Sequence, residues 1–258
     1  MQPFVVGTWK QRPCLFDRLP VEVVSEVYDL SRLETIMSRM KDSDLFCRRA
    51  TGGVGEPMPR ILNSGFTGCL ERRLEKECLS INMSTLQKYD SVISEVLDRF
   101  VRVLAPAIQM RPSDILYPTA AIFLSSPRAT TCYHDDRENN FLMHLRGRKT
   151  LHVFPSKATI ASEFVKACFR KRQGIHETYR SDLERDAQMF PMPPRTTLYI
   201  PRLCPHWVDN GSEVSVSMSL NFFTHPDYLL EKVYAVNDRL RAAVGRWSGR
   251  ERAASGKY

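Results

Sequence analysis

TCYHDDRENNFLMHLRGRKT, residues Thr131–Thr150, contains the His-x-Asp pair around which we expect the fold to be organised. In an extended segment, residues i and i+2 point to the same side. His134 and Asp136 can therefore chelate one ion, whereas Asp135 points away. Only a helical segment would exchange the roles of the two aspartates, and the β-type residues around them argue against a helix. A further histidine, His206, follows in the stretch LYIPRLCPHWVDNGSEVSVSMSLNFF.

Two imidazoles and one carboxylate can occupy one face of an octahedral metal and leave three positions open. Non-haem Fe(II) oxygenases hold their metal in this way, and the same ligands can also hold zinc. A His-x-Asp pair is common by chance, so the pair alone does not establish a metal site. We interpret the remaining histidines of the strand region, His144 and His152, as packing or surface residues.

The composition fits one globular domain, with 258 residues of which 43% are hydrophobic and 26% are charged. The net charge of +8 favours a solvated charged face over a nucleic-acid surface, because the basic residues are spread along the chain. No apolar run approaches the ~20 residues of a membrane span, and the first ten residues do not resemble a secretion signal. The seven cysteines are widely spread without a CxxC motif, which predicts free thiols in a reducing, cytoplasmic compartment.

The first part of the chain carries helical periodicity. Apolar residues at mixed three- and four-residue spacings predict one or two short helices over 21–40. Asp29 or Ser31 is expected to cap the second of them, with Glu34 completing a capping box with Ser31. A longer helix is predicted over 84–108, with Pro106 marking its end.

From residue 114 onwards, short apolar runs bounded by Pro, Gly and Asn predict strands. The run 214–223 alternates apolar residues with Ser and Asn, and small polar side chains suit the inner wall of a barrel that leaves room for a ligand. Gly147 predicts a tight hairpin, because glycine accepts a positive φ. The predicted fold class is therefore mainly β with flanking helices, built on a double-stranded β-helix (jelly-roll or cupin) core.

We expect three regions along the chain. An N-terminal segment of helices and strands, 1–113, packs on the core, and 114–226 form the barrel. A helical, exposed insertion over 156–193 interrupts the barrel and is well placed to be a lid or a recognition element. Residues 227–258 form a C-terminal amphipathic helix with a basic tail, and this helix is a candidate homodimer surface.

Four stretches together resemble a known family. The His-x-Asp pair, GRKTLHVFP at 147–155, LYIPRLCPHWV at 198–208 and SMSLNFF at 217–223 resemble the JmjC and cupin-like 2-oxoglutarate oxygenases. The similarity is greatest to the asparaginyl-hydroxylase and ribosomal-oxygenase branches, and it covers roughly 120–224 without the insertion.

The resemblance implies a role for each matching position. His134, Asp136 and His206 match the iron ligands of the family. Lys149 matches the lysine that pairs with the far carboxylate of 2-oxoglutarate, and Thr131 matches a threonine that contacts the same carboxylate. Two asparagines match residues that line the cosubstrate pocket of the asparaginyl-hydroxylase branch, namely Asn140 and Asn221.

The implied activity is an Fe(II)- and 2-oxoglutarate-dependent dioxygenase that uses O₂. It would hydroxylate a protein or peptide side chain, or a small molecule, while 2-oxoglutarate is decarboxylated to succinate. Two alternatives stay open: a non-catalytic cupin-like binding or regulatory protein, and a zinc hydrolase or isomerase. Lys149 argues against the zinc enzyme, which needs no deep cation for a dicarboxylate.

Overall fold

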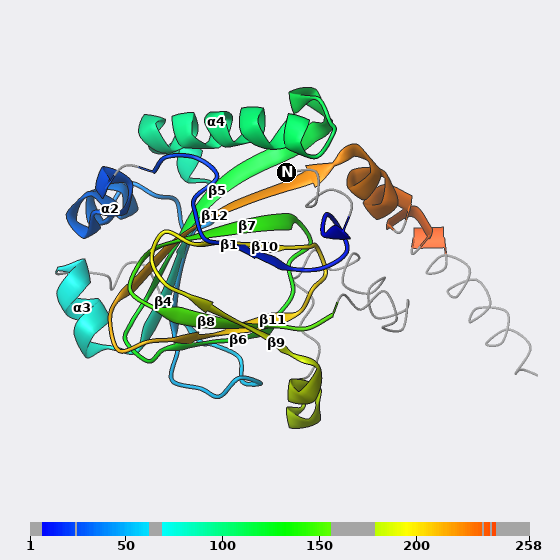
Figure 1. Cartoon of the computed structure of the whole chain (residues 1–258). Helices are drawn as coiled ribbons and strands as arrows, with labels where there is room; N and C mark the ends of the chain where they lie inside the picture. The colour runs from blue at the N-terminus through cyan, green and yellow to red at the C-terminus, as the bar shows by residue number, and fades with distance from the viewer. Residues whose placement is uncertain are drawn as a thin grey trace, which may run out of the picture.

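The computed structural model describes residues 7–23, 25–61, 69–155, 179–233, 235–237 and 239–240. Two antiparallel sheets face each other, and helices cover the outer side of the larger one (Figure 1). The larger sheet has eight strands in the order β1-β10-β7-β12-β5-β4-β2-β3, and the smaller has four in the order β6-β11-β8-β9. This architecture confirms the predicted jelly-roll core with flanking helices.

The strands of the described chain are β1 (Cys14–Phe16), β2 (Leu45–Arg49), β3 (Arg60–Ile61), β4 (Leu79–Met83), β5 (Ile115–Ser125), β6 (Thr130–His134), β7 (Asn139–Arg146), β8 (Lys149–Val153), β9 (Gln188–Met192), β10 (Thr197–Ile200), β11 (His206–Asn210) and β12 (Ser215–Thr224). The α-helices are α2 (Leu30–Met37), α3 (Leu70–Lys76) and α4 (Ser91–Ala107), and the 3-10 helices are η1 (Ser25–Tyr28), η3 (Leu86–Lys88), η4 (Pro112–Asp114) and η5 (Ser181–Asp186). Residues 225–233 are also helical.

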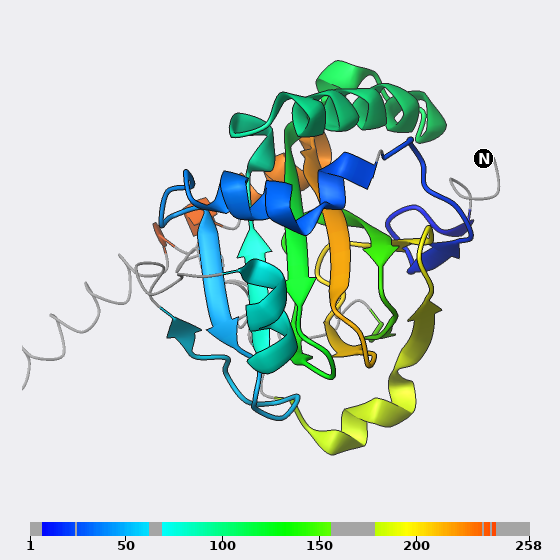
Figure 2. The same cartoon turned by 90° about the vertical axis from the view of Figure 1, so that its left-hand side faces the viewer.

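The N-terminal part of the chain extends the larger sheet at both edges. Strand β1 pairs with β10 at one edge, and β4, β2 and β3 continue the sheet beyond β5 at the other. Helices α2, α3 and α4 lie over the outer face of this sheet (Figure 2). The expected helices are present, and they place an apolar layer behind the sheet rather than beside the metal ligands.

The helix starts follow from capping side chains. Asp29 caps α2, where its carboxylate accepts from the amide of Arg32 at 2.9 Å. The predicted capping box does not form, because the carboxylate of Glu34 accepts instead from the amide of Leu70 at 3.2 Å. Helix α4 begins later than predicted because Asp90 provides its cap, and it ends one residue after its internal proline.

The connection at Gly147 differs from the predicted hairpin. Strand β7 belongs to the larger sheet and β8 to the smaller, so the turn carries the chain from one sheet to the other. Gly147 has a φ of 79°, as expected, and a Cβ there would lie 2.7 Å from the carbonyl oxygen of Val214. The hairpin prediction was wrong because a turn signal fixes the bend but not the partner strand.

The predicted insertion is described only in its second half, since 156–178 lie outside the described residues. Its later part contains η5, in line with the helical expectation, but also β9, which pairs with β8 over its whole length. The helical prediction was therefore wrong for the end of the insertion, which completes the smaller sheet.

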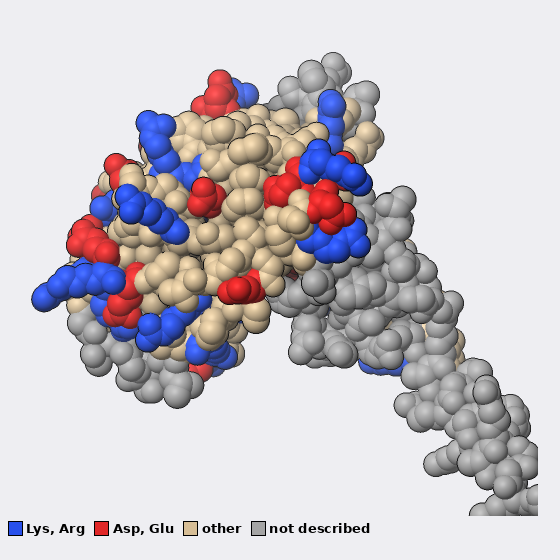
Figure 3. Space-filling view, turned by 90° about the horizontal axis from the view of Figure 1, so that it is seen from below, with Lys and Arg blue, Asp and Glu red and all other residues tan. Residues whose placement is uncertain are grey.

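Charged residues of both signs are intermixed on the described part of the face shown in Figure 3. This arrangement agrees with a solvated charged surface, as the sequence predicted. None of the described helices combines the length and the apolar character needed to cross a bilayer.

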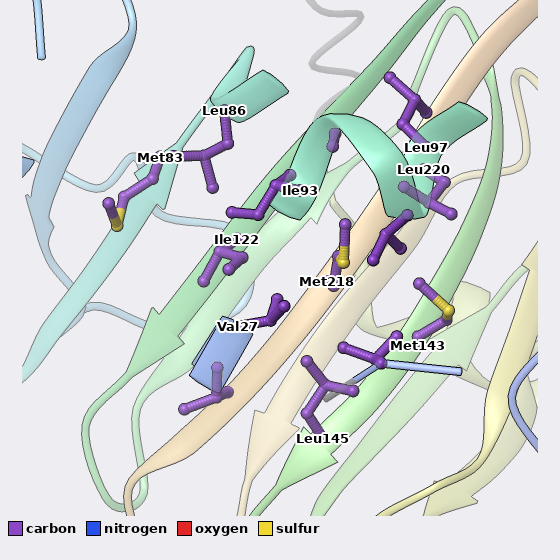
Figure 4. Packing of buried hydrophobic residues seen from close by; sticks show 14 of the residues in the cluster. Val27, Met83, Leu86, Ile93, Leu97, Ile122, Met143, Leu145, Met218 and Leu220 are labelled. Atoms are coloured by element: carbon purple, nitrogen blue, oxygen red, sulfur yellow. The ribbon is translucent and has the colours of Figure 1, made fainter. Parts of the chain in front are cut away.

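The main hydrophobic core lies between the larger sheet and its helices. Helix α4 contributes Ile93, Leu97 and Phe100, which meet the outward side chains of the sheet, including Met218 and Leu220 (Figure 4). A second, smaller apolar cluster lies between the two sheets, and it joins Leu151, Val153 and Val208 of the smaller sheet to residues of β7 and β10.

Strand β12 separates these two regions. Its apolar residues, Val216, Met218, Leu220 and Phe222, belong to the helix-covered core. The intervening serines and Asn221 therefore face the space between the sheets. The predicted small polar inner wall is present.

Candidate metal centre

The two candidate histidine ligands lie on neighbouring strands of the smaller sheet. His134 ends β6, His206 begins β11, and the two are directly paired in the antiparallel register. Directly opposite residues point to the same face of a sheet, and the two ring centroids are 4.3 Å apart. Strand pairing thus brings together two histidines that lie far apart in the sequence.

Asp136 completes the group two residues after His134. One ligand atom from each of His134, Asp136 and His206 lies within 4.8 Å of the others. Within the described chain, these three residues form the one group of three or more potential metal ligands. The structure therefore brings together the three residues predicted from the sequence.

Backbone carbonyls orient both imidazoles. Nδ1 of His134 lies 2.7 Å from the carbonyl oxygen of Cys132, and Nδ1 of His206 lies 3.1 Å from that of Cys204. A carbonyl only accepts, so Nδ1 carries the proton in each ring and Nε2 keeps its lone pair. The Nε2 of His206 lies 4.0 Å from Oδ2 of Asp136. This tautomer is the one that a metal bound at Nε2 requires.

Burial keeps the first histidine neutral. Desolvation, followed by the nearby His206, lowers the pKa of His134 to about 4. A neutral imidazole is ready to bind a cation without first releasing a proton. Beside it, desolvation and the Asp136 carboxylate raise the pKa of Glu138.

The two predicted asparagines lie in a hydrogen-bond chain that begins at the metal ligands. Nδ2 of Asn140 donates to Oδ2 of Asp136 at 3.0 Å. Oγ of Ser219 lies 2.9 Å from Oδ1 of Asn140 and 2.9 Å from Oδ1 of Asn221. These residues belong to β7 and β12, so the larger sheet supports a ligand set held mainly by the smaller one.

Lys149 is buried at the start of β8, with a relative exposure of 6%. It alternates with the buried Leu151 and Val153, as expected for an inward-facing side chain. Desolvation lowers the pKa of Lys149 to about 7. Within the described chain no carboxylate forms an ion pair with this lysine.

Thr131 lies on the same sheet, where it pairs with Val208 of β11. Val208 pairs in turn with Leu151 of β8, so all three side chains share one face. Val208 and Leu151 belong to the apolar cluster between the sheets. Thr131 is therefore on the inner wall, as the resemblance implied, on the strand that carries His134.

The other strand histidines have structural partners. Nε2 of His144 lies 2.9 Å from the carbonyl oxygen of Gly147, and Nδ1 lies 2.9 Å from Oγ of Ser217. Desolvation and the nearby Lys149 lower the pKa of His144 to about 3. His152 stacks on Trp207, with ring centroids 3.7 Å apart. Neither belongs to the metal-ligand group.

The sequence reasoning missed an ionic cluster beside the metal ligands. Arg137, which directly follows Asp136, pairs with Glu231 of the C-terminal helix at 2.6 Å. Arg202, in the loop before His206, pairs with the same carboxylate at 3.2 Å. The available signal was the i, i+4 spacing of Asp227 and Glu231, which places two acids on one face of the helix.

A cavity of 620 Å³ lies elsewhere, between the segment Thr8–Pro20, helix α4 and the outer face of the larger sheet. Its apolar lining includes Phe16, Phe100 and Phe141. Phe141 points away from the space between the sheets, since it belongs to the helix-covered core. This cavity is therefore separate from the metal centre.

Comparisons with known proteins support the fold. No protein-family model and no curated protein matches the chain. Among solved structures, the Escherichia coli ribosomal oxygenase YcfD matches with a TM-score of 0.51 and 16% identity over 86% of this chain and 51% of that one. The same protein in complex with cobalt and 2-oxoglutarate matches with a TM-score of 0.51 and 14% identity, over 90% of this chain and 56% of that one.

A third structure, YcfD with cobalt and succinic acid, matches with a TM-score of 0.50 and 15% identity, over 86% of this chain and 51% of that one. The chain thus spans a little over half of the length of these structures. The predicted resemblance to the ribosomal-oxygenase branch is confirmed at the level of the fold, which this chain shares with YcfD.

Proposed function

We propose that this protein is an Fe(II)- and 2-oxoglutarate-dependent dioxygenase that hydroxylates a protein or peptide side chain or a small molecule. Two features of the smaller sheet and its adjoining turn together carry the proposal. Two histidines and an aspartate converge within 4.8 Å, and a buried lysine without a carboxylate partner in the described chain lies on the same four-stranded sheet.

The residues present fit the implied metal. Two neutral imidazoles and one carboxylate can bind one face of Fe(II) and leave three positions for other ligands. The carbonyls of Cys132 and Cys204 hold the rings of His134 and His206 in the required tautomer. Asn140 holds the Asp136 carboxylate from the opposite sheet.

The residues present also fit a dicarboxylate cosubstrate. A buried ammonium without a counterion is costly, and a bound carboxylate would compensate its charge. Lys149 would hold the far carboxylate of 2-oxoglutarate, with Thr131 contributing a hydroxyl. Burial and the Lys149 charge lower the pKa of His144, so this ring stays neutral beside the lysine, with Gly147 accepting its Nε2 proton and Ser217 positioned to donate to Nδ1.

Bound iron would supply O₂ activation coupled to the decarboxylation of 2-oxoglutarate to succinate and CO₂. The protein residues would hold the metal on one side, fix the cosubstrate at its far end, and line part of the space between the sheets with apolar side chains. The apolar cluster of Leu151, Val153 and Val208 limits water there.

The experiment measures 2-oxoglutarate binding in the presence of Mn(II) and succinate formation in the presence of Fe(II). We expect both in the parent protein. We expect His134→Ala and Asp136→Ala to abolish succinate formation, because each removes a metal ligand. Undiminished turnover in either variant would contradict the proposal. Failure to bind 2-oxoglutarate would instead favour the non-catalytic cupin-like alternative.

A macromolecular substrate is the preferred class. The similar solved structures are described as a ribosomal oxygenase, which supports a protein substrate for this chain as well. Incubating the protein with cell extract, Fe(II) and 2-oxoglutarate, followed by mass spectrometry, would reveal peptides that gain one oxygen atom. If only small molecules gain oxygen in such extracts, the protein-substrate assignment is wrong.

We also propose that the C-terminal helix forms a homodimer surface. Its outward side chains are apolar and exposed, with Leu229 62%, Val233 61%, Val236 53% and Leu240 61% accessible. Their four- and three-residue spacings place them along one stripe, which suits pairing with a second copy. Sedimentation should show a dimer for the parent and a monomer for Val233→Glu. A monomeric parent would contradict this surface.

A further inference from the structure

Both loops that present metal ligands meet at the C-terminal helix. Asp136 lies in the turn between β6 and β7, and His206 follows the loop between β10 and β11. The two loops contact each other directly, since the amide of Leu203 donates to the carbonyl oxygen of Asp136 at 2.7 Å. Their relative position therefore helps to set the distance between two of the three ligands.

One carboxylate joins these loops from outside. Oε2 of Glu231 accepts from Nη2 of Arg137 at 2.6 Å, and Oε1 accepts from Nη2 of Arg202 at 3.2 Å. Arg137 is adjacent to Asp136 in sequence, and Arg202 lies four residues before His206. Each oxygen of the carboxylate thus holds one ligand-bearing loop.

The ionic contacts are largely shielded from water. The Glu231 side chain is 9% exposed, that of Arg202 is 10% exposed and that of Arg137 is 26% exposed. Without this carboxylate, the shielded salt-bridge link between Arg137 and Arg202 would be lost, and Arg202 would keep its contact with Asp227. The loops would then separate or rearrange.

The helix that carries Glu231 is itself anchored by charge. The carboxylate of Asp227 binds the ammonium of Lys10 at 2.8 Å and accepts from Nδ2 of Asn139 at 2.9 Å. Arg202 also lies 3.5 Å from Oδ1 of Asp227. Since Asp227 and Glu231 are one helical turn apart, the position of Glu231 is fixed relative to the sheet.

We propose that Glu231 is a positioning residue of the metal centre, which sets the separation of the Asp136 and His206 loops through Arg137 and Arg202. This inference rests on the proposed metal site. Glu231 touches neither metal nor substrate, so it acts only by fixing the ligands in the arrangement that binds the ion.

The test is Mn(II) affinity, measured from the electron paramagnetic resonance signal of the free ion. Glu231→Gln keeps the shape of the side chain but removes its charge and one acceptor. We expect it to weaken Mn(II) binding by about tenfold or more, within the ~10- to 100-fold range typical of residues that orient metal ligands. The absorption bands of bound Co(II) should also shift, because they report ligand geometry rather than global stability.

The matched control is Asp90→Asn, which breaks a buried ion pair away from the metal. Asp90 is 7% exposed and lies 2.7 Å from Arg32. Asparagine can still cap α4 through its side-chain oxygen, so the change lowers stability through the lost ion pair with Arg32. We expect its Mn(II) affinity and Co(II) bands to match those of the parent, which separates positioning from general destabilisation.

Arg137→Gln provides a second variant should Glu231→Gln fail to fold. It releases one loop and leaves the contacts of Arg202 with the helix. We expect weaker Mn(II) binding, and a double variant with Glu231→Gln that loses less than the product of the two single effects. Parent-like Mn(II) affinity in the folded single variants would overturn the inference alone. A parent protein that binds no Mn(II) would overturn the metal centre, and this inference with it.

Discussion

The two faces of strand β12 differ in chemistry although they belong to the same ten residues. Its outer face packs Met218, Leu220 and other fully buried apolar side chains against the helices. Its inner face carries Ser217 and Ser219, which contact His144 and Asn140 between the sheets. The outer face therefore contributes stability, whereas the inner face supports the proposed site.

Both faces are largely buried, but burial has opposite consequences on them. Removing apolar surface from water stabilises the fold, so the outer face needs only shape and volume. Burying polar and charged groups costs free energy unless they are paired. The polar side chains of the inner face therefore add little to stability, and they matter mainly for what they bind. Substitutions on the two faces should accordingly separate stability from ligand binding.

The largest expected effect on stability is on the outer face. Leu220 is fully buried in the main core, and Leu220→Ala removes its contacts and leaves a cavity. We expect a loss of about 2–5 kcal/mol in the free energy of unfolding, measured by chemical denaturation. The folded fraction should keep the Mn(II) affinity of the parent. A large loss of metal affinity in folded Leu220→Ala would break the distinction between the faces.

Lys149→Met on the inner wall should weaken ligand binding without lowering stability, which is the opposite of the effect expected for Leu220→Ala. We expect 2-oxoglutarate affinity to fall by roughly 30- to 1,000-fold, as for the loss of one partner of a buried charge pair. The free energy of unfolding should rise, because a buried ammonium that pairs with no carboxylate among the described residues is replaced by an apolar side chain of similar length. Calorimetry and denaturation check the two effects.

The neighbouring Arg148 provides the control, since it is exposed. Arg148→Met removes the same charge one residue earlier, and its 2-oxoglutarate affinity should equal that of the parent. If both variants lose affinity equally, the effect comes from general electrostatics, and Lys149 does not hold the cosubstrate.

A change of pH should alter the affinity for 2-oxoglutarate by a smaller amount, again through the charge of Lys149. Burial lowers the pKa of Lys149 to about 7 in the free protein, and a bound carboxylate favours the charged form. Binding therefore takes up a proton above pH 7, and the dissociation constant of 2-oxoglutarate should rise toward tenfold per pH unit. His144 stays neutral in this range, because its pKa is about 3. In Lys149→Arg the rise should disappear, because the guanidinium keeps its charge.

The sequence pointed to His134, Asp136 and Lys149 because their signals are local or periodic. The i, i+2 spacing of His134 and Asp136 and the alternation of β8 and β12 both translate directly into side-chain direction. His206 was proposed as the second imidazole of the set and then supported by the family resemblance, since nothing in its immediate surroundings reveals which strand it pairs with.

Features that depend on long-range pairing were missed. The turn at Gly147 was recognisable, but the sheet to which β8 belongs was not, because a turn residue does not select a partner strand. The contact of Glu231 with Arg137 and Arg202 joins three segments far apart in sequence. The apolar residues of the same helix drew attention to its apolar face, whereas Asp227 and Glu231 are the residues that the structure buries.

Ser219→Ala should have the smallest effect on Mn(II) affinity, and it tests the hydrogen bonds of the inner face most directly. Its hydroxyl lies 2.9 Å from the side-chain oxygens of both Asn140 and Asn221, and one proton can satisfy only one of them at a time. Asn140 in turn donates to Asp136 at 3.0 Å. Loss of one such hydrogen bond is worth about 1 kcal/mol, so Mn(II) affinity should fall by roughly fivefold.

Ser217→Ala on the same face is the matched control, because its hydroxyl contacts His144 instead of Asn140. Its Mn(II) affinity should equal that of the parent. If Ser219→Ala also binds Mn(II) like the parent, the hydrogen-bond chain from β12 does not orient Asp136. The metal centre would then depend on the smaller sheet and its adjoining loops alone, and the inner face of β12 would serve only to leave room between the sheets.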